Sequence, residues 1–158
     1  MKRRLSLLLM IVLLCVLPSA QADVPQISGS LFSSAKDALV CLASGEYERL
    51  VTLLPFSGVA PSATEWQSFA GNFSTLGSGV QTEYAVAYWT GADWCLAVPV
   101  ATPSSGDVEV MALISADGST FSGYRYASWS QIQSECQSAS YVTWNEEYVD
   151  SEPVIAVD

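Results

Sequence analysis

The chain has 158 residues, half of them hydrophobic, with 16 acidic side chains, six basic side chains and no histidine. This length suffices for one domain with its own core. The lack of histidine excludes Ser–His and Cys–His nucleophile pairs and histidine proton shuttles, and it removes the commonest zinc ligand.

The first 22 residues have the pattern of a secretory signal peptide. Residues 2–4 are basic, residues 5–17 are an apolar run, Pro18 interrupts that run, and Ala20-Gln21-Ala22 fits a small-x-small cleavage site. The apolar run is too short and wrongly flanked for a stable membrane span. We therefore expect residues 1–22 to be removed and the mature protein to be secreted or to lie on the exterior of the cell envelope.

Two other interpretations of this segment stay open. It could remain as an uncleaved anchor, although so short a core crosses a bilayer only marginally. A lipoprotein signal is disfavoured because Leu14, not a small residue, precedes Cys15.

The mature chain is strongly acidic. Only Lys36, Arg49 and Arg125 remain after residue 22, against all 16 acidic residues, so the net charge is −13. Nucleic-acid binding requires clustered cations and is excluded, and an anionic membrane surface is disfavoured. Solubility outside the cell explains this charge most simply.

Three helices are expected before the strands. Apolar residues at steps of three and four predict a helix from residue 30 to 42, ended by Gly45, and a short second helix over 47–54 closed by Pro55. A third helix begins with the capping box Ser62-x-x-Glu65 and continues to about Leu76.

The apolar period then changes from 3.6 to 2, which predicts strands. They cover residues 80–90, 94–101, 107–115 and 119–128. Helices followed by an antiparallel meander indicate an α+β fold. We take residues 23–129 as one α+β domain and 130–158 as an acidic, partly ordered C-terminal segment, in which SQIQSECQ could form a helical turn.

The last predicted hairpin can be placed in register. A type I turn at Ala116-Asp117 with Gly118 in the left-handed region places Leu113 opposite Phe121 and Glu109 opposite Arg125. That register predicts a cross-strand ion pair on one face of the sheet. The alternative, a two-residue Asp-Gly turn, would shift the pairing by one residue and break this ion pair.

Two stretches carry a resemblance to a known family. LASGEYERLVTLL resembles the helix pair, and VEVMALISADGSTFSGYRY the closing hairpin, of NTF2-like domains, especially the small secreted bacterial domains of the DUF3887 and DUF4878 type. The resemblance covers roughly residues 30–128. It implies an NTF2-like (cystatin-like) cone, with three N-terminal helices packed on a four-stranded antiparallel meander around an apolar pocket.

Four residues are candidates for that pocket: Glu109, Arg125, Tyr88 and Trp66. Some NTF2-like enzymes use a carboxylate base with a tyrosine donor, and Glu109 with a strand tyrosine such as Tyr88 could imitate them. A structural role is favoured, with Glu109 a cross-strand partner of Arg125. We therefore assign no catalytic residue.

The cysteines of the mature chain are Cys41, Cys95 and Cys136. In an oxidising compartment, one disulfide and one free thiol is the simplest expectation. Cys41 and Cys136 are the favoured pair because both look peripheral, but the other pairings and three buried thiols stay open. No CxxC, phosphate-binding loop or calcium loop is present, so no cofactor and no metal are expected.

Trp89 and Trp94 flank a tight turn and are expected either to clasp the hairpin or, less favoured, to bind a sugar, a peptide or a partner. Function is predicted at the level of class. The leading hypothesis is an exported, non-enzymatic module that binds a small apolar ligand in the cone. The alternatives are a protein-interaction module, with the sheet mediating a homodimer, and an acid/base enzyme of the isomerase or dehydratase kind.

Overall fold

The computed structural model describes residues 24–103, 108–144 and 154–155. The predicted signal segment, residues 1–22, lies outside them. Among the helices of these residues, none has the length and hydropathy that a bilayer crossing requires. In chain order the elements are α2 (Gly29–Ser44), α3 (Tyr47–Leu53), α4 (Ala63–Ala70), the 3-10 turn η1 (Leu76–Ser78), β1 (Val86–Trp89), β2 (Trp94–Pro99), β3 (Glu109–Ser115), β4 (Gly123–Ser128), α5 (Trp129–Ser138), β5 (Tyr141–Trp144) and β6 (Val154–Ile155).

The helix boundaries follow the local sequence signals. Gly45 adopts the left-handed conformation with φ 74° and ends α2, as predicted, and α3 begins two residues later. The capping box of α4 is also confirmed, since Ser62 and Glu65 exchange both hydrogen bonds. That helix ends at Ala70, earlier than predicted, and the Asn72 side chain donates to the Phe69 carbonyl just beyond its end.

The predicted antiparallel meander is confirmed and is wider than expected. The sheet order is β4-β3-β2-β1-β5-β6, with β5 paired antiparallel to β1. Residues 130–144, which were expected in a partly ordered segment, thus belong to a ten-residue helix that begins at Trp129 and to a sheet strand.

The predicted register of the β3–β4 hairpin is wrong. Leu113 lies opposite Tyr124 and Glu109 opposite Ser128, while Arg125 lies opposite Ala112. The observed pairing is shifted by three residues from the predicted one. Because this is an odd number, Glu109 and Arg125 lie on opposite faces of the sheet and form no cross-strand pair.

The connection between these strands explains the shift. The Asp117 carboxylate accepts hydrogen bonds from the backbone of Ser119 and Thr120, both at 2.8 Å, which widens the turn. Phe121 then donates its N–H to the Pro55 carbonyl at 2.7 Å. Because this bond directs the N–H of Phe121 to Pro55 instead of to β3, the pairing of β4 with β3 begins only at Gly123.

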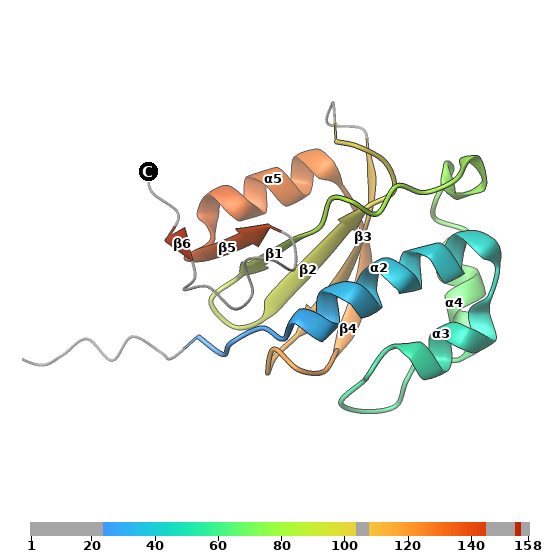
Figure 1. Ribbon diagram of the computed structural model, residues 1–158, viewed down its shortest axis with the longest axis horizontal. Coiled ribbons are helices and arrows are strands. Elements are labelled where there is room, and N and C mark those ends of the chain that lie inside the picture. Colours follow the sequence, from blue (N-terminus) through green and yellow to red (C-terminus); the bar gives the residue numbers. More distant parts are fainter. Residues whose placement is uncertain (1–23, 104–107, 145–153, 156–158) are drawn as a thin grey trace, which may run out of the picture.

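Helices cover both faces of the sheet (Figure 1). On one face α2, α3 and α4 pack against a core that includes Phe32, Trp66, Leu96 and Phe121. On the other face α5 packs over a smaller cluster, whose buried members are Val86, Tyr88, Cys95, Ala97, Val110, Ala112, Ala127, Trp129, Ile132 and Ala139. The described residues form an α+β fold of three layers, in which α5 covers the second face.

Candidate functional site

The four residues predicted to line one pocket lie in three separate places. Trp66 belongs to the core beneath α2, α3 and α4. Glu109 lies at the start of β3 and holds the segment that follows α4. Tyr88 and Arg125 meet on the opposite face of the sheet, under α5. Only the last two are brought together.

Trp66 fills the interior between the helices and the sheet. Its side chain is fully buried, and its ring lies 4.5 Å from that of Tyr124, 5.9 Å from that of Phe69 and 6.3 Å from that of Phe56, centroid to centroid. Its indole N–H has no hydrogen-bond partner among the described residues. These contacts are those of an aromatic core, so Trp66 acts here as a packing residue.

Glu109 is a backbone clamp. Its carboxylate accepts the N–H groups of Ser74 at 2.8 Å and Thr75 at 3.0 Å, together with both of their hydroxyls. Burial alone would raise the pKa of Glu109, but the hydrogen bonds from Thr75 and Ser74 outweigh it and lower the pKa to about 2. The Tyr126 hydroxyl is a fifth donor to this carboxylate, at 3.4 Å. A carboxylate occupied by five donors is unsuited to act as a general base.

Under α5, Tyr88, Arg125 and Glu135 form a polar cluster. The Tyr88 hydroxyl and an Arg125 Nη both donate to Glu135 Oε2, and the same Nη lies 3.1 Å from the Tyr88 hydroxyl. The other Glu135 oxygen accepts the Gln131 amide at 3.1 Å. Three strands and a helix are thereby tied at one point, since Tyr88 Oη and the Cys95 thiol both lie beside Arg125.

The environment of this cluster favours a fastening role over acid/base chemistry. Burial is the main cause that raises the pKa of Tyr88, and the neighbouring Cys95 and Glu135 raise it further. For Arg125, burial would lower the pKa, but its neighbours Cys95, Tyr88 and Glu135 outweigh that effect and raise it. Tyr88 therefore stays a neutral donor and Arg125 a cation, which together hold Glu135 of α5.

Sequence reasoning missed Glu135, the third member of this cluster. It is the one acidic residue in a neutral stretch, SQIQSECQS, and that isolation was the only available signal. The position of its partners depends on the β3–β4 register, which local sequence predicted wrongly.

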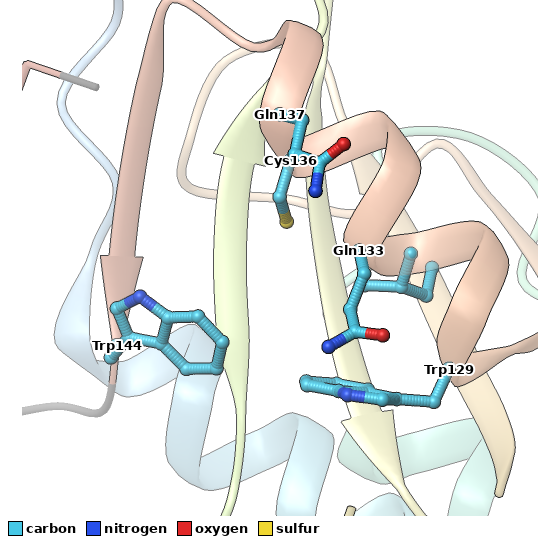
Figure 2. Close-up of a pocket in the computed structure, with 6 residues that line it drawn as sticks. Trp129, Gln133, Cys136, Gln137 and Trp144 are labelled. Carbon is cyan, nitrogen blue, oxygen red and sulfur yellow. The ribbon is translucent and has the colours of Figure 1, made fainter. Parts of the chain in front are cut away.

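A pocket of about 260 Å³ lies beside this cluster, between α5 and β5 (Figure 2). It is lined by Trp129, Ile132, Gln133, Cys136, Gln137 and Trp144. The five residues from α5 recur at i, i+3, i+4, i+7 and i+8, which is one face of a helix. Trp144 comes from β5, which pairs with β1 in the sheet.

The two indoles form an open corner. Their ring centroids are 6.0 Å apart and their planes are inclined at 58°. Trp129 is 5% exposed and forms the floor, whereas Trp144 is 46% exposed and forms a side wall. The Gln133 amide lies above the Trp129 ring, and the Cys136 thiol points into the pocket (Figure 2). Among the lining residues that the structure describes, none has a charged side chain.

The structure does not bring the predicted disulfide partners together. Cys41 belongs to α2 and lies in the large core, while Cys95 lies in the cluster on the other face of the sheet and Cys136 of α5 packs against that cluster. All three are free thiols. Burial, then the nearby Cys95 and Glu135, raises the pKa of Cys136 to about 12. Within the described residues, no cluster of three or more cysteine and carboxylate side chains could hold a metal ion.

Trp89 and Trp94 clasp the β1–β2 hairpin. They are cross-strand partners with ring centroids 5.7 Å apart, and both are buried. The Trp94 indole also donates to the Pro25 carbonyl at 2.6 Å. The favoured structural interpretation of this pair is confirmed.

Comparison with known proteins identifies no relative of this chain. No family model matches it, and no match was found among the curated proteins or the solved structures.

Proposed function

We propose that this chain is an exported, non-enzymatic binding module whose small-ligand site is the pocket between α5 and β5. The observation that carries the proposal is the corner formed by Trp129 and Trp144, an open concavity whose described lining residues carry no charge and in which one indole is 46% exposed. Concave sites with aromatic walls and a few polar groups are typical of small-molecule binding.

This proposal moves the ligand from the helix–sheet interior to the second face of the sheet. The proposed NTF2-like cone is supported by three helices followed by a four-stranded meander. Its interior, however, is occupied around Trp66 by the rings of Phe56, Phe69 and Tyr124. The α5–β5 pocket offers a surface that a ligand reaches without displacing core side chains.

The alternatives have less support. Dimerisation through a sheet face would require an uncovered face, and the chain's own helices pack on both. Acid/base catalysis would require an available carboxylate, and both oxygens of Glu135 already accept hydrogen bonds from Tyr88, Arg125 and Gln131.

Native mass spectrometry of the mature protein, purified gently after export from cells, tests the proposal. We expect a reproducible extra mass on the wild type that is lost in Trp144→Ala, because that substitution removes a pocket wall without opening the core. The matched control is Val40→Ala, an apolar side chain of α2 with nearly the same exposure, 44% against 46%.

Adding a neutral apolar dye, N-phenyl-1-naphthylamine, covers the case of a ligand lost on purification. Dye binding that is equal in the wild type and Trp144→Ala would contradict this location. A protein that carries no extra mass and shows no Trp144-dependent binding of the dye or of any other small-molecule probe would contradict the proposal as a whole.

A further inference from the structure

We infer that the ligand of the α5–β5 pocket is a neutral carbohydrate, with a pyranose ring packed against the Trp144 indole over the floor formed by Trp129. The inference rests on the proposed function and specifies its ligand class. Four features of the pocket lead to it: its ring faces, its amides, its charge and its size.

The indoles provide the kind of surface that a sugar ring recognises. An indole carries partial negative charge on its face, and the C–H bonds on one side of a pyranose carry partial positive charge. Trp144 presents such a face at 46% exposure, and the 58° inclination of Trp129 leaves the corner open. A flat sugar ring therefore gains apolar contact and electrostatic attraction from the same wall.

The amides provide hydrogen bonds to hydroxyl groups. Gln133 and Gln137 line the pocket on successive turns of α5, and neither side chain is hydrogen-bonded to another described residue. Each amide offers both a donor and an acceptor, which matches a hydroxyl group that also donates and accepts. A purely apolar ligand would leave the Gln133 amide, which lies over the Trp129 ring, without a partner (Figure 2).

The charge and the volume of the pocket narrow the class of ligand further. Among the described lining residues there is no cation to pair with a phosphate or carboxylate and no anion to hold an amine. The mature chain, with 16 acidic and three basic residues after position 22, repels anions at longer range. The volume of about 260 Å³ is below the roughly 300–1,000 Å³ of most ligand pockets, which suits one or two sugar rings.

The test uses the indole N–H signals of the full mature protein in ¹H–¹⁵N NMR spectra. The chain has five tryptophans, so five signals are expected, and Trp→Phe variants assign them. The probes are the methyl glycosides of glucose, galactose, mannose and N-acetylglucosamine. The control is D-glucitol, which has similar hydroxyl groups but no ring face.

We expect at least one glycoside to shift the Trp129 and Trp144 signals saturably, with a dissociation constant of about 1 mM or tighter. Glucitol should leave them unmoved, and Trp66, Trp89 and Trp94 should not respond. Trp144→Ala and Gln133→Ala should each weaken binding about tenfold or more, whereas Val40→Ala should bind like the wild type. Because Gln133 and Trp144 are exposed, these variants should fold.

Three results would overturn the inference. If no glycoside shifts either signal at about 50 mM while the dye binds in a Trp144-dependent manner, the pocket takes apolar ligands and only the proposed function stands. If a polyproline peptide shifts these signals and the glycosides do not, the ligand is a peptide. If neither dye, sugar nor peptide binds and the purified protein carries no extra mass, the inference and the proposed function both fail.

Discussion

Glu109 shows how a single carboxylate can organise a loop. It accepts hydrogen bonds from two consecutive backbone N–H groups after α4, and both neighbouring hydroxyls reinforce them. The sequence indicated a charged residue at the start of a strand, and it could not indicate that Ser74 and Thr75 would supply the donors. Its predicted partner Arg125 lies on the other face of the sheet.

Replacing Glu109 by glutamine should destabilise the protein by about 2–3 kcal/mol. An amide can accept at only one of its two terminal atoms, so its NH₂ group would face the donors of Ser74 or Thr75. Urea unfolding measures the loss. Glu83→Gln, at an exposed position, is the control and should change stability by less than about 0.5 kcal/mol. Equal effects of the two substitutions would refute the clamp.

The pH dependence of stability should carry the same signature. The pKa of Glu109 falls from an ordinary 4.5 to about 2 on folding, so its ionised form stabilises the fold fully above about pH 4.5. That contribution is lost as the pH falls from there through about 2. Urea unfolding at pH 5 and pH 2.5 should show a smaller decrease for Glu109→Gln than for the wild type. Identical decreases would show that Glu109 does not titrate with folding.

The helix α5 was the element least visible in the sequence, and it builds the candidate site. Periodicity identified α2, α3 and α4 because each presents an apolar stripe to the large core. In α5 the stripe combines two hydrophobic residues, Trp129 and Ile132, with amides and a thiol. A helix that covers a small cluster and lines a pocket needs fewer apolar positions, so its pattern is weaker.

Glu135→Ala should loosen α5 selectively. The ion pair with Arg125, about one third exposed on each side chain, contributes under about 1 kcal/mol. The Tyr88 hydroxyl, left without its acceptor in a buried site, adds about 1–3 kcal/mol. Hydrogen exchange should therefore accelerate in α5 and β5 while the amides of α2 keep their protection.

Tyr88→Phe is the informative companion to that variant. It removes the hydroxyl and its need for a partner together, so it should cost less than Glu135→Ala. The double variant should lose less unfolding free energy than the sum of the losses in the two single variants, because the two residues are in contact. Uniform acceleration across α2 and α5, or full additivity, would argue against a local fastening.

At the scale of the whole molecule, the sheet separates two compartments. The order of helices and the four-stranded meander followed from local patterns, because turn residues and periodicity are encoded nearby in the chain. The β3–β4 register and the addition of β5 depend on contacts distant in sequence, such as Phe121 with Pro55 and β5 with β1. The register was predicted wrongly and β5 was not predicted. Both affected the candidate site, because the register and β5 together determine which side chains face α5.

This layering makes a prediction about the three thiols. Cys41 belongs to α2 and Cys136 to α5, on opposite faces of the sheet, so a disulfide joining them would require the chain to unfold first. We expect peptide mapping of exported, unreduced protein to find no Cys41–Cys136 bond. Alkylation of the folded protein should reach Cys136 first, since it is the least buried of the three.

The alkylation of Cys136 should still be slower than that of a solvent-exposed thiol, because burial raises the pKa of Cys136 to about 12 and few thiolates form at neutral pH. Cys41 and Cys95 should react only at the rate of unfolding, and 6 M urea should equalise all three. Alkylation of Cys41 ahead of Cys136 in the folded state would contradict the arrangement of the two cores. A disulfide-linked Cys41–Cys136 peptide recovered from cooperatively folded protein would contradict this prediction, because α5 would then have to pack differently.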